Sequence, residues 1–74
     1  MTENEIINIV VKHINIKKNN IKLNSKIEDL PGWDSLNLFN IVMDIERKSK
    51  KKLNINKFLK IKTFKEFIEL IEKK

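Results

Sequence analysis

The chain has 74 residues, a formal net charge of +6 at pH 7 and no cysteine. A domain of this size buries only about 60 % of its unfolded surface. Disulfides and thiolate metal sites are excluded, so the core must come from Ile, Leu, Val and Phe side chains. One glycine and one proline disfavour a turn-rich β-sandwich and favour helices. Without a membrane-length apolar run or a secretory leader, we expect one soluble, cytoplasmic, all-α domain over 1–74.

The charge is unevenly distributed along the chain. All sixteen Lys and Arg residues lie outside the segment 28–46. The residues outside this segment therefore carry a net charge of +11. A basic protein invites a nucleic-acid function, because clustered cations neutralise phosphates. Two features argue against it: the abundance of Lys, Asn and Ile is typical of AT-rich codons, and the segment 28–46 is purely acidic. Its charged residues are Glu28, Asp29, Asp34, Asp44 and Glu46.

The first predicted helix covers about 3–15. Thr2 and Glu5 have the spacing of a capping box, in which each side chain accepts the other residue's backbone N–H. His13 lies near the end of this helix without a second ligand nearby in sequence, so we expect it to be solvated or partly packed. The apolar residues recur at helical spacing and are Ile6, Ile7, Val10, Val11 and Ile14.

The segment 16–33 predicts a long loop that isolated apolar side chains attach to the core. Loops of this length in a small domain usually carry function or contain a short helix. Pro31 and Gly32 predict a closing turn, because Pro restricts φ and Gly tolerates positive φ. The apolar residues expected to hold the loop are Ile21, Leu23, Ile27 and Leu30.

A second helix is predicted over about 36–48, with Asp34 as its N-cap and basic residues at its end, where cations complement the helix dipole. We expect Phe39, Val42 and Ile45 in the core. The main apolar stripe runs at steps of three and four residues, through Leu36, Phe39, Val42, Met43 and Glu46, and it is widened by Leu38, Ile41 and Ile45.

The rest of the chain predicts a short third helix within 53–59 and a last helix opened by a second capping box, Thr63 to Glu66. The last helix has a clean apolar stripe of Phe64, Phe67, Ile68 and Ile71. The predicted architecture is therefore a small four-helix bundle with three longer helices, one short helix and a long loop between the first two.

The most informative motif is Asp34-Ser35-Leu36, which places a serine hydroxyl at the exposed start of the second helix. No His, Cys or second catalytic group lies in sequence reach of Ser35. The chain also has no acid–base pair, metal cluster or phosphate-binding loop, so we expect no catalytic residues and no enzyme. Ser35 is better interpreted as a serine that another enzyme modifies. The plain alternative is an ordinary first-turn helix serine.

At this motif the chain resembles the acyl carrier protein family, which includes acyl, peptidyl, aryl and D-alanyl carriers. The resemblance implies that Ser35 carries 4′-phosphopantetheine, transferred from coenzyme A by a phosphopantetheinyl transferase, with acyl or aminoacyl cargo held as a thioester. Asp34 and Leu36 belong to the implied attachment motif. The resemblance covers essentially the whole chain and depends on Asp34-Ser35-Leu36, on Leu38, Val42, Met43 and Glu46, and on the spacing onward to Leu53, Ile61, Thr63-Phe64 and Ile68.

The resemblance further implies a carrier that visits loading and transferring enzymes, for which we expect a monomer. From the residues themselves we expect no bound metal, no membrane insertion and no nucleic-acid binding. Trp33, the single Trp, either packs over the core or covers the base of the arm. The residues expected to contact partner enzymes are Leu36, Met43, Asp44 and Glu46.

The chain departs from typical fatty-acid carriers, which are strongly acidic. Asn37 and Asn40 stand where that pattern has carboxylates, and Arg47 and Lys48 reverse the sign at the helix end. Electrostatic complementarity sets partner choice, so we expect a specialised carrier of fatty-acid or secondary-metabolite biosynthesis rather than a housekeeping one. A bulky Phe58 in the short helix favours short or polar cargo.

Two other classes of function stay open. One is a small basic helical module that binds nucleic acid through the charge block 48–52, although this block lacks the interleaved aromatic residues of single-strand binders. The other is a helical bundle that only binds a protein partner, in which Ser35→Ala would have no effect.

Overall fold

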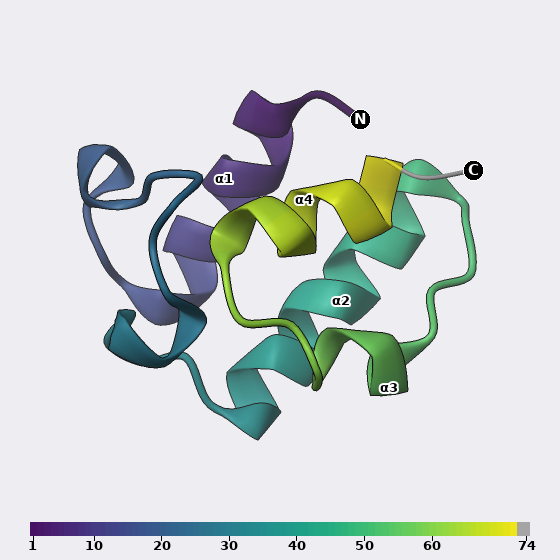
Figure 1. The fold of residues 1–74 in the computed structure, drawn as a ribbon. Coiled ribbons are helices and arrows are strands. Elements are labelled where there is room, and N and C mark those ends of the chain that lie inside the picture. The colour runs from purple at the N-terminus through teal and green to yellow at the C-terminus, as the bar shows by residue number, and fades with distance from the viewer. Residues whose placement is uncertain (73–74) are drawn as a thin grey trace.

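Four α-helices and two 3-10 turns enclose one core in the computed structural model, which describes residues 1–72 (Figure 1). Residues 1–72 contain no β-strand, only an isolated antiparallel bridge between Lys26 and Thr63. The predicted all-helical fold is therefore confirmed over this range. The elements are α1 (Glu3–Ile14), η1 (Lys18–Asn20), η2 (Ile27–Asp29), α2 (Ser35–Ser49), α3 (Ile55–Phe58) and α4 (Phe64–Glu72).

Both predicted capping boxes are present. The Glu5 N–H donates to Thr2 Oγ1 at 3.2 Å, and the Thr2 N–H donates to Glu5 Oε1 at 2.9 Å. Thr63 and Glu66 make the same reciprocal pair at 3.3 Å in each direction. These bonds satisfy N–H groups that have no partner inside the helix. Helix starts are thus decided locally, which explains why α1 and α4 begin where the sequence predicts.

The long connection between α1 and α2 lies at one side of the helices (Figure 1) and is fastened to the start of α4. The Phe64 N–H donates to the Ser25 carbonyl and the Lys65 N–H to the Leu23 carbonyl, each at 2.9 Å. The connection includes η1 and η2, in agreement with the expectation of short helical structure. Ile21, Ile27 and Leu30 are buried as predicted, and the side chain of Leu23 is 40 % exposed. The prediction that the Leu23 side chain packs into the core was wrong, because Leu23 holds the loop through its backbone carbonyl, which accepts the Lys65 N–H.

The core is formed by one face of each longer helix and by the aromatic residues at the C-terminal end of the chain. Phe67 stacks on Phe64 with 5.6 Å between ring centroids and meets Phe58 edge-on at 5.4 Å. Helix α1 packs against α2, and α3 contacts both α2 and α4. The largest fully buried side chains are Phe64, Phe67, Ile6, Ile41, Ile45 and Val10.

The assignment of Phe39 to the core was wrong, because this side chain is 49 % exposed. A helix turns about 100° per residue, and the buried residues of α2 are Leu38, Ile41, Val42 and Ile45. These four span an arc of about 100°, and Phe39 lies outside it. In α1, Ile9 is buried although the predicted stripe omitted it, whereas Ile7 and Val11 are half-buried.

Within residues 1–72, no helix combines the length and the apolar character needed to cross a membrane.

Candidate functional site at the start of helix α2

Ser35 is the first residue of α2 and is exposed. Asp34 caps the helix as predicted, with its Oδ1 accepting the Asn37 N–H at 2.8 Å. The hydrogen bonds at this helix end involve Asp34, Asn37 and Gly32 and leave the Ser35 hydroxyl outside the network. The structure therefore presents a serine oxygen at the surface, next to a capped helix start.

The turn before Ser35 is packed against the end of α1. Gly32 has φ of +80°, and the Trp33 N–H donates to the Leu30 carbonyl at 3.2 Å, as in a type II turn with Pro at its second position. A Cβ added to Gly32 would lie 3.1 Å from the Ile14 carbonyl oxygen. The positive φ favours glycine, and the close approach of Ile14 leaves little room for a Cβ. The predicted Pro-Gly turn is confirmed, and its contact with α1 explains the position of the motif.

Trp33, the last residue of this turn, packs against two aromatic residues of α4. Its ring meets Phe67 edge-on with 5.2 Å between centroids and Phe64 at 6.5 Å. Such edge-to-face pairs add about 0.5–1.5 kcal/mol beyond burial. The Asn37 side-chain amide also donates to the Gly32 carbonyl at 2.7 Å. Of the two interpretations of Trp33, packing over the core is what the structure shows, and this packing holds the backbone that carries Ser35.

The electrostatics of this helix end favour an anion at Ser35. The first N–H groups of a helix have no intrahelical partner and carry the positive end of the dipole. Asp34 Oδ1 accepts the Asn37 N–H, so the N–H groups of Ser35 and Leu36 are the first-turn donors for which the helix itself supplies no acceptor. The Asp34 carboxylate opposes this effect at short range. An anionic group at this position would therefore have N–H donors nearby and one neighbouring negative charge, that of Asp34.

The chain's single histidine is occupied elsewhere. His13 Nε2 lies 2.9 Å from Asp44 Oδ2, joining α1 to α2. No hydrogen-bonded base therefore activates Ser35 within residues 1–72. The same residues contain no group of three His, Cys, Asp or Glu side chains with metal-binding geometry. The partly packed state expected for His13 is confirmed, but its partner was missed because 31 positions separate the two residues.

The two acidic residues predicted to contact partners make bonds within the chain. Asp44 is only 16 % exposed, and its pKa is lowered chiefly by the hydrogen bond from His13. The Arg47 guanidinium lies 3.6 Å from Asp44 Oδ1. Glu46 accepts the Leu53 N–H at 2.6 Å and so fastens the segment after α2. These carboxylates are therefore committed to the fold, although contact with a partner at these positions stays a prediction.

The two apolar residues predicted to contact partners are exposed, Leu36 at 70 % and Met43 at 42 %. Phe39 lies between them at 49 % exposure. We name these three residues the α2 apolar stripe. The sequence contained a signal for it: at about 100° per residue, the apolar residues of α2 fall into two separate arcs. Merging them into one wide stripe concealed the second arc.

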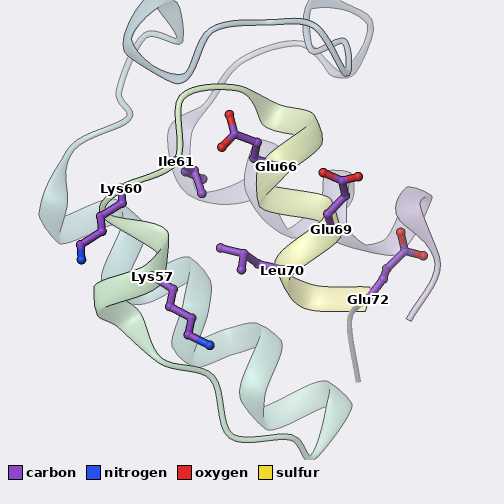
Figure 2. Close-up of a pocket in the computed structure, with 7 residues that line it drawn as sticks. All are labelled: Lys57, Lys60, Ile61, Glu66, Glu69, Leu70 and Glu72. Carbon is purple, nitrogen blue, oxygen red and sulfur yellow. The ribbon is translucent and has the colours of Figure 1, made fainter.

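A hollow of about 650 Å³ lies between α3 and α4. Figure 2 shows lysines along one side and carboxylates along the other, with Ile61 and Leu70 between them. Phe58 does not line it and is buried against Phe67. The hollow is a charged surface groove that does not include Ser35, and its charged residues are Lys57, Lys60, Glu66, Glu69 and Glu72.

A scan against protein-family models and a search of curated proteins found no match to this chain. The functional interpretation therefore depends on the residues and geometry described above.

Proposed function

We propose that the chain is a carrier protein of the acyl-carrier type, which holds an acyl or aminoacyl group as a thioester on 4′-phosphopantetheine attached to Ser35. The observation that carries the proposal is the exposed Ser35 hydroxyl, outside every local hydrogen bond, at the first position of α2. Rigid support of this residue by Gly32 and Trp33 suits a site that several enzymes must find in the same orientation.

The attachment chemistry needs little from the chain itself. The Ser35 oxygen forms a bond to the phosphorus next to the pantetheine of coenzyme A, the pyrophosphate bond breaks, and the nucleotide leaves. A base of the transferase takes the hydroxyl proton. The chain supplies an accessible oxygen and N–H donors near the new phosphodiester. When attached, the group supplies the thiol that the cysteine-free chain lacks.

The charges of α2 support a specialised carrier. Asn37 and Asn40 are neutral, and the carboxylates of Asp44 and Glu46 are bound within the chain. This helix therefore presents no row of free carboxylates. Enzymes that dock on an acidic helix gain little attraction here, because charge complementarity governs association rate and partner choice.

The test is intact-protein mass spectrometry after incubation with coenzyme A and a broad-specificity phosphopantetheinyl transferase. We expect one phosphopantetheine increment in the wild type and none in Ser35→Ala. Ser49→Ala is the matched control, because Ser49 belongs to the same helix but bonds the Ile45 carbonyl at 2.7 Å. It should be modified like the wild type. No increment with several transferases, on protein shown to be folded by circular dichroism, would contradict the proposal.

The alternative of a nucleic-acid-binding module is favoured only by the exposed lysines after residue 47, Lys48, Lys50, Lys51 and Lys52. It predicts strong retention of unmodified protein on DNA that falls steeply with salt. Retention of this kind together with an unmodified Ser35 would replace the carrier proposal.

A further inference from the structure

The hollow between α3 and α4 gathers residues that play no part in the candidate site (Figure 2). We name this hollow of about 650 Å³ the α3–α4 groove. Ile61 and Leu70 point into it and are half-buried, so they form an apolar floor. None of the lining residues belongs to α2. The groove therefore includes neither Ser35 nor any residue of the α2 apolar stripe.

The two walls of the groove carry opposite charges. Lys57 and Lys60 line one side, and Glu69 and Glu72 of α4 line the other (Figure 2). All four side chains are exposed. Among the ion pairs within residues 1–72, none joins the lysine wall to the carboxylate wall. The groove can therefore pair with a ligand that carries both signs of charge.

The depression extends beyond this groove. A second hollow of about 620 Å³ shares Ile61 and Glu66 with it and continues toward Lys26 and Lys62. Glu66 at this junction accepts the Thr63 N–H at 3.3 Å, so its carboxylate is already bound within the chain. A compact small molecule would fill only part of so long a depression, whereas a segment of polypeptide can follow it.

We propose that the α3–α4 groove docks an amphipathic helix of a partner protein. The apolar stripe of that helix rests on the groove floor, its carboxylates face the lysine wall and its cations face the carboxylate wall. Residues three or four positions apart lie on one side of a helix, so one helix can present both charges as parallel rows. Hydrophobic grooves take amphipathic helices in this way.

This inference goes beyond the proposed function. Because no residue of α2 lines the groove, a helix bound there leaves Ser35 accessible. The partner can therefore hold the chain while a different enzyme acts on Ser35.

Charge complementarity favours a mixed-charge protein segment over other occupants, since like charges brought face to face are unfavourable. A nucleic acid or an anionic membrane would meet Glu69 and Glu72. A purely cationic segment would meet Lys57 and Lys60. A second copy of the chain carries both signs of charge, but its groove is concave as well, and two hollows placed face to face do not fill each other.

The experiment is a nuclear magnetic resonance titration of the 15N-labelled chain with three helical peptides of about 14 residues, or roughly four turns. All three have the same apolar stripe. The mixed peptide carries glutamates along one flank of the stripe and lysines along the other. The acidic peptide carries glutamates on both flanks, and the basic peptide carries lysines on both. We expect the mixed peptide to bind at least about tenfold more tightly than either of the others, with shift changes centred on α3 and α4.

Charge reversal of each wall sharpens the test. Lys57→Glu combined with Lys60→Glu makes both walls acidic and should move the tightest binding to the basic peptide. Glu69→Lys combined with Glu72→Lys makes both walls basic and should move it to the acidic peptide. These side chains are exposed, so the fold should be retained, and circular dichroism checks it.

The matched control is Lys51→Glu combined with Lys52→Glu. It changes the net charge as much as reversal of the lysine wall does, but neither residue lines the groove. This variant should keep the preference of the wild type for the mixed peptide. Loss of that preference would show that net charge, rather than the groove, selects the peptide, and would overturn the inference.

Several results with the wild type would also overturn it. These are no binding of the mixed peptide, equal binding of all three peptides, or tightest binding of the acidic or the basic one. Shift changes centred on α2 would place the peptide outside the groove. Concentration-dependent sedimentation without peptide, together with shifts in α3 and α4, would assign the groove to a second copy instead. The titration uses the unmodified chain, so its result is independent of whether Ser35 is modified.

Discussion

The two apolar faces of α2 have similar side chains, but one face is buried and the other is exposed. Leu38, Ile41, Val42 and Ile45 are at most 3 % exposed, while Leu36, Phe39 and Met43 are at least 42 % exposed. The two faces differ in what packs against them. Helix α1 packs against the buried face, and no described segment covers the exposed one. Periodicity locates apolar arcs on a helix, but only the packing of the other helices decides which arc becomes core and which stays available for binding.

The largest expected effect tests this comparison directly. Ile41→Ala removes a side chain with no exposed surface and should lower the free energy of unfolding by about 2–5 kcal/mol, because it leaves a cavity. Phe39→Ala removes a larger side chain and should change it by about 0.5 kcal/mol or less, as exposed substitutions do. Urea unfolding of both variants provides the measurement. Equal losses would mean that Phe39 is covered in solution.

The second prediction concerns Gly32 in the turn before α2. Gly32→Ala should destabilise the fold by about 1–2 kcal/mol, because φ is positive and a Cβ would approach Ile14. Gly32→Asn separates the two causes, since Asn tolerates positive φ but also carries a Cβ. If thermal unfolding shows Asn to be as harmful as Ala, the contact with Ile14 is responsible. Recovery with Asn would point to the backbone angle instead.

The cap of α2 should contribute less. Asp34→Ala loses the acceptor for the Asn37 N–H and should cost about 1 kcal/mol in the free energy of unfolding. Asp34→Asn keeps an acceptor oxygen at the same position and is the control, with little expected loss. Chemical denaturation measures both. If Asp34→Asn lowers the free energy of unfolding as much as Asp34→Ala does, the negative charge rather than the hydrogen bond stabilises this helix end.

The smallest expected effect concerns the His13–Asp44 contact between α1 and α2. Because the pKa of Asp44 is lowered from its ordinary value of 3.8, the ionised carboxylate stabilises the fold above about pH 4. This contribution is lost as the pH falls through the lowered pKa. Asp44→Asn should therefore be less stable than the wild type near pH 6, by about 1 kcal/mol or less.

The difference between Asp44→Asn and the wild type should shrink as the pH is lowered below 4. Thermal unfolding across the acid range measures it. A difference that stays constant with pH would assign the effect to packing rather than to charge.

Features that depend on neighbouring residues could be predicted from the sequence. Both capping boxes, the Pro-Gly turn and the Asp34 cap involve partners no more than three or four positions apart, and all are present. The exposed position of Ser35 follows from the same local rules, since it comes directly after a capping residue. Local chemistry therefore places the candidate site at the start of α2.

Features that depend on distant residues could not be predicted in the same way. His13 and Asp44 meet across 31 positions, and the backbone of Leu23 pairs with Lys65. Phe39 was assigned to the core because its spacing fits a buried stripe as well as an exposed one. Each case needs the relative placement of two helices, which spacing along one of them does not contain.

The sequence by itself therefore determined the helices, their caps, the turn and the serine at its exit, because these depend on backbone geometry and on side chains within one or two helical turns. Only the tertiary structure decided which face of α2 is buried, that Asp44 and Glu46 are bound inside the chain, and that Trp33 rests on Phe67. These outcomes depend on which surfaces the chain brings together in space, where burial and hydrogen bonding join residues far apart in sequence.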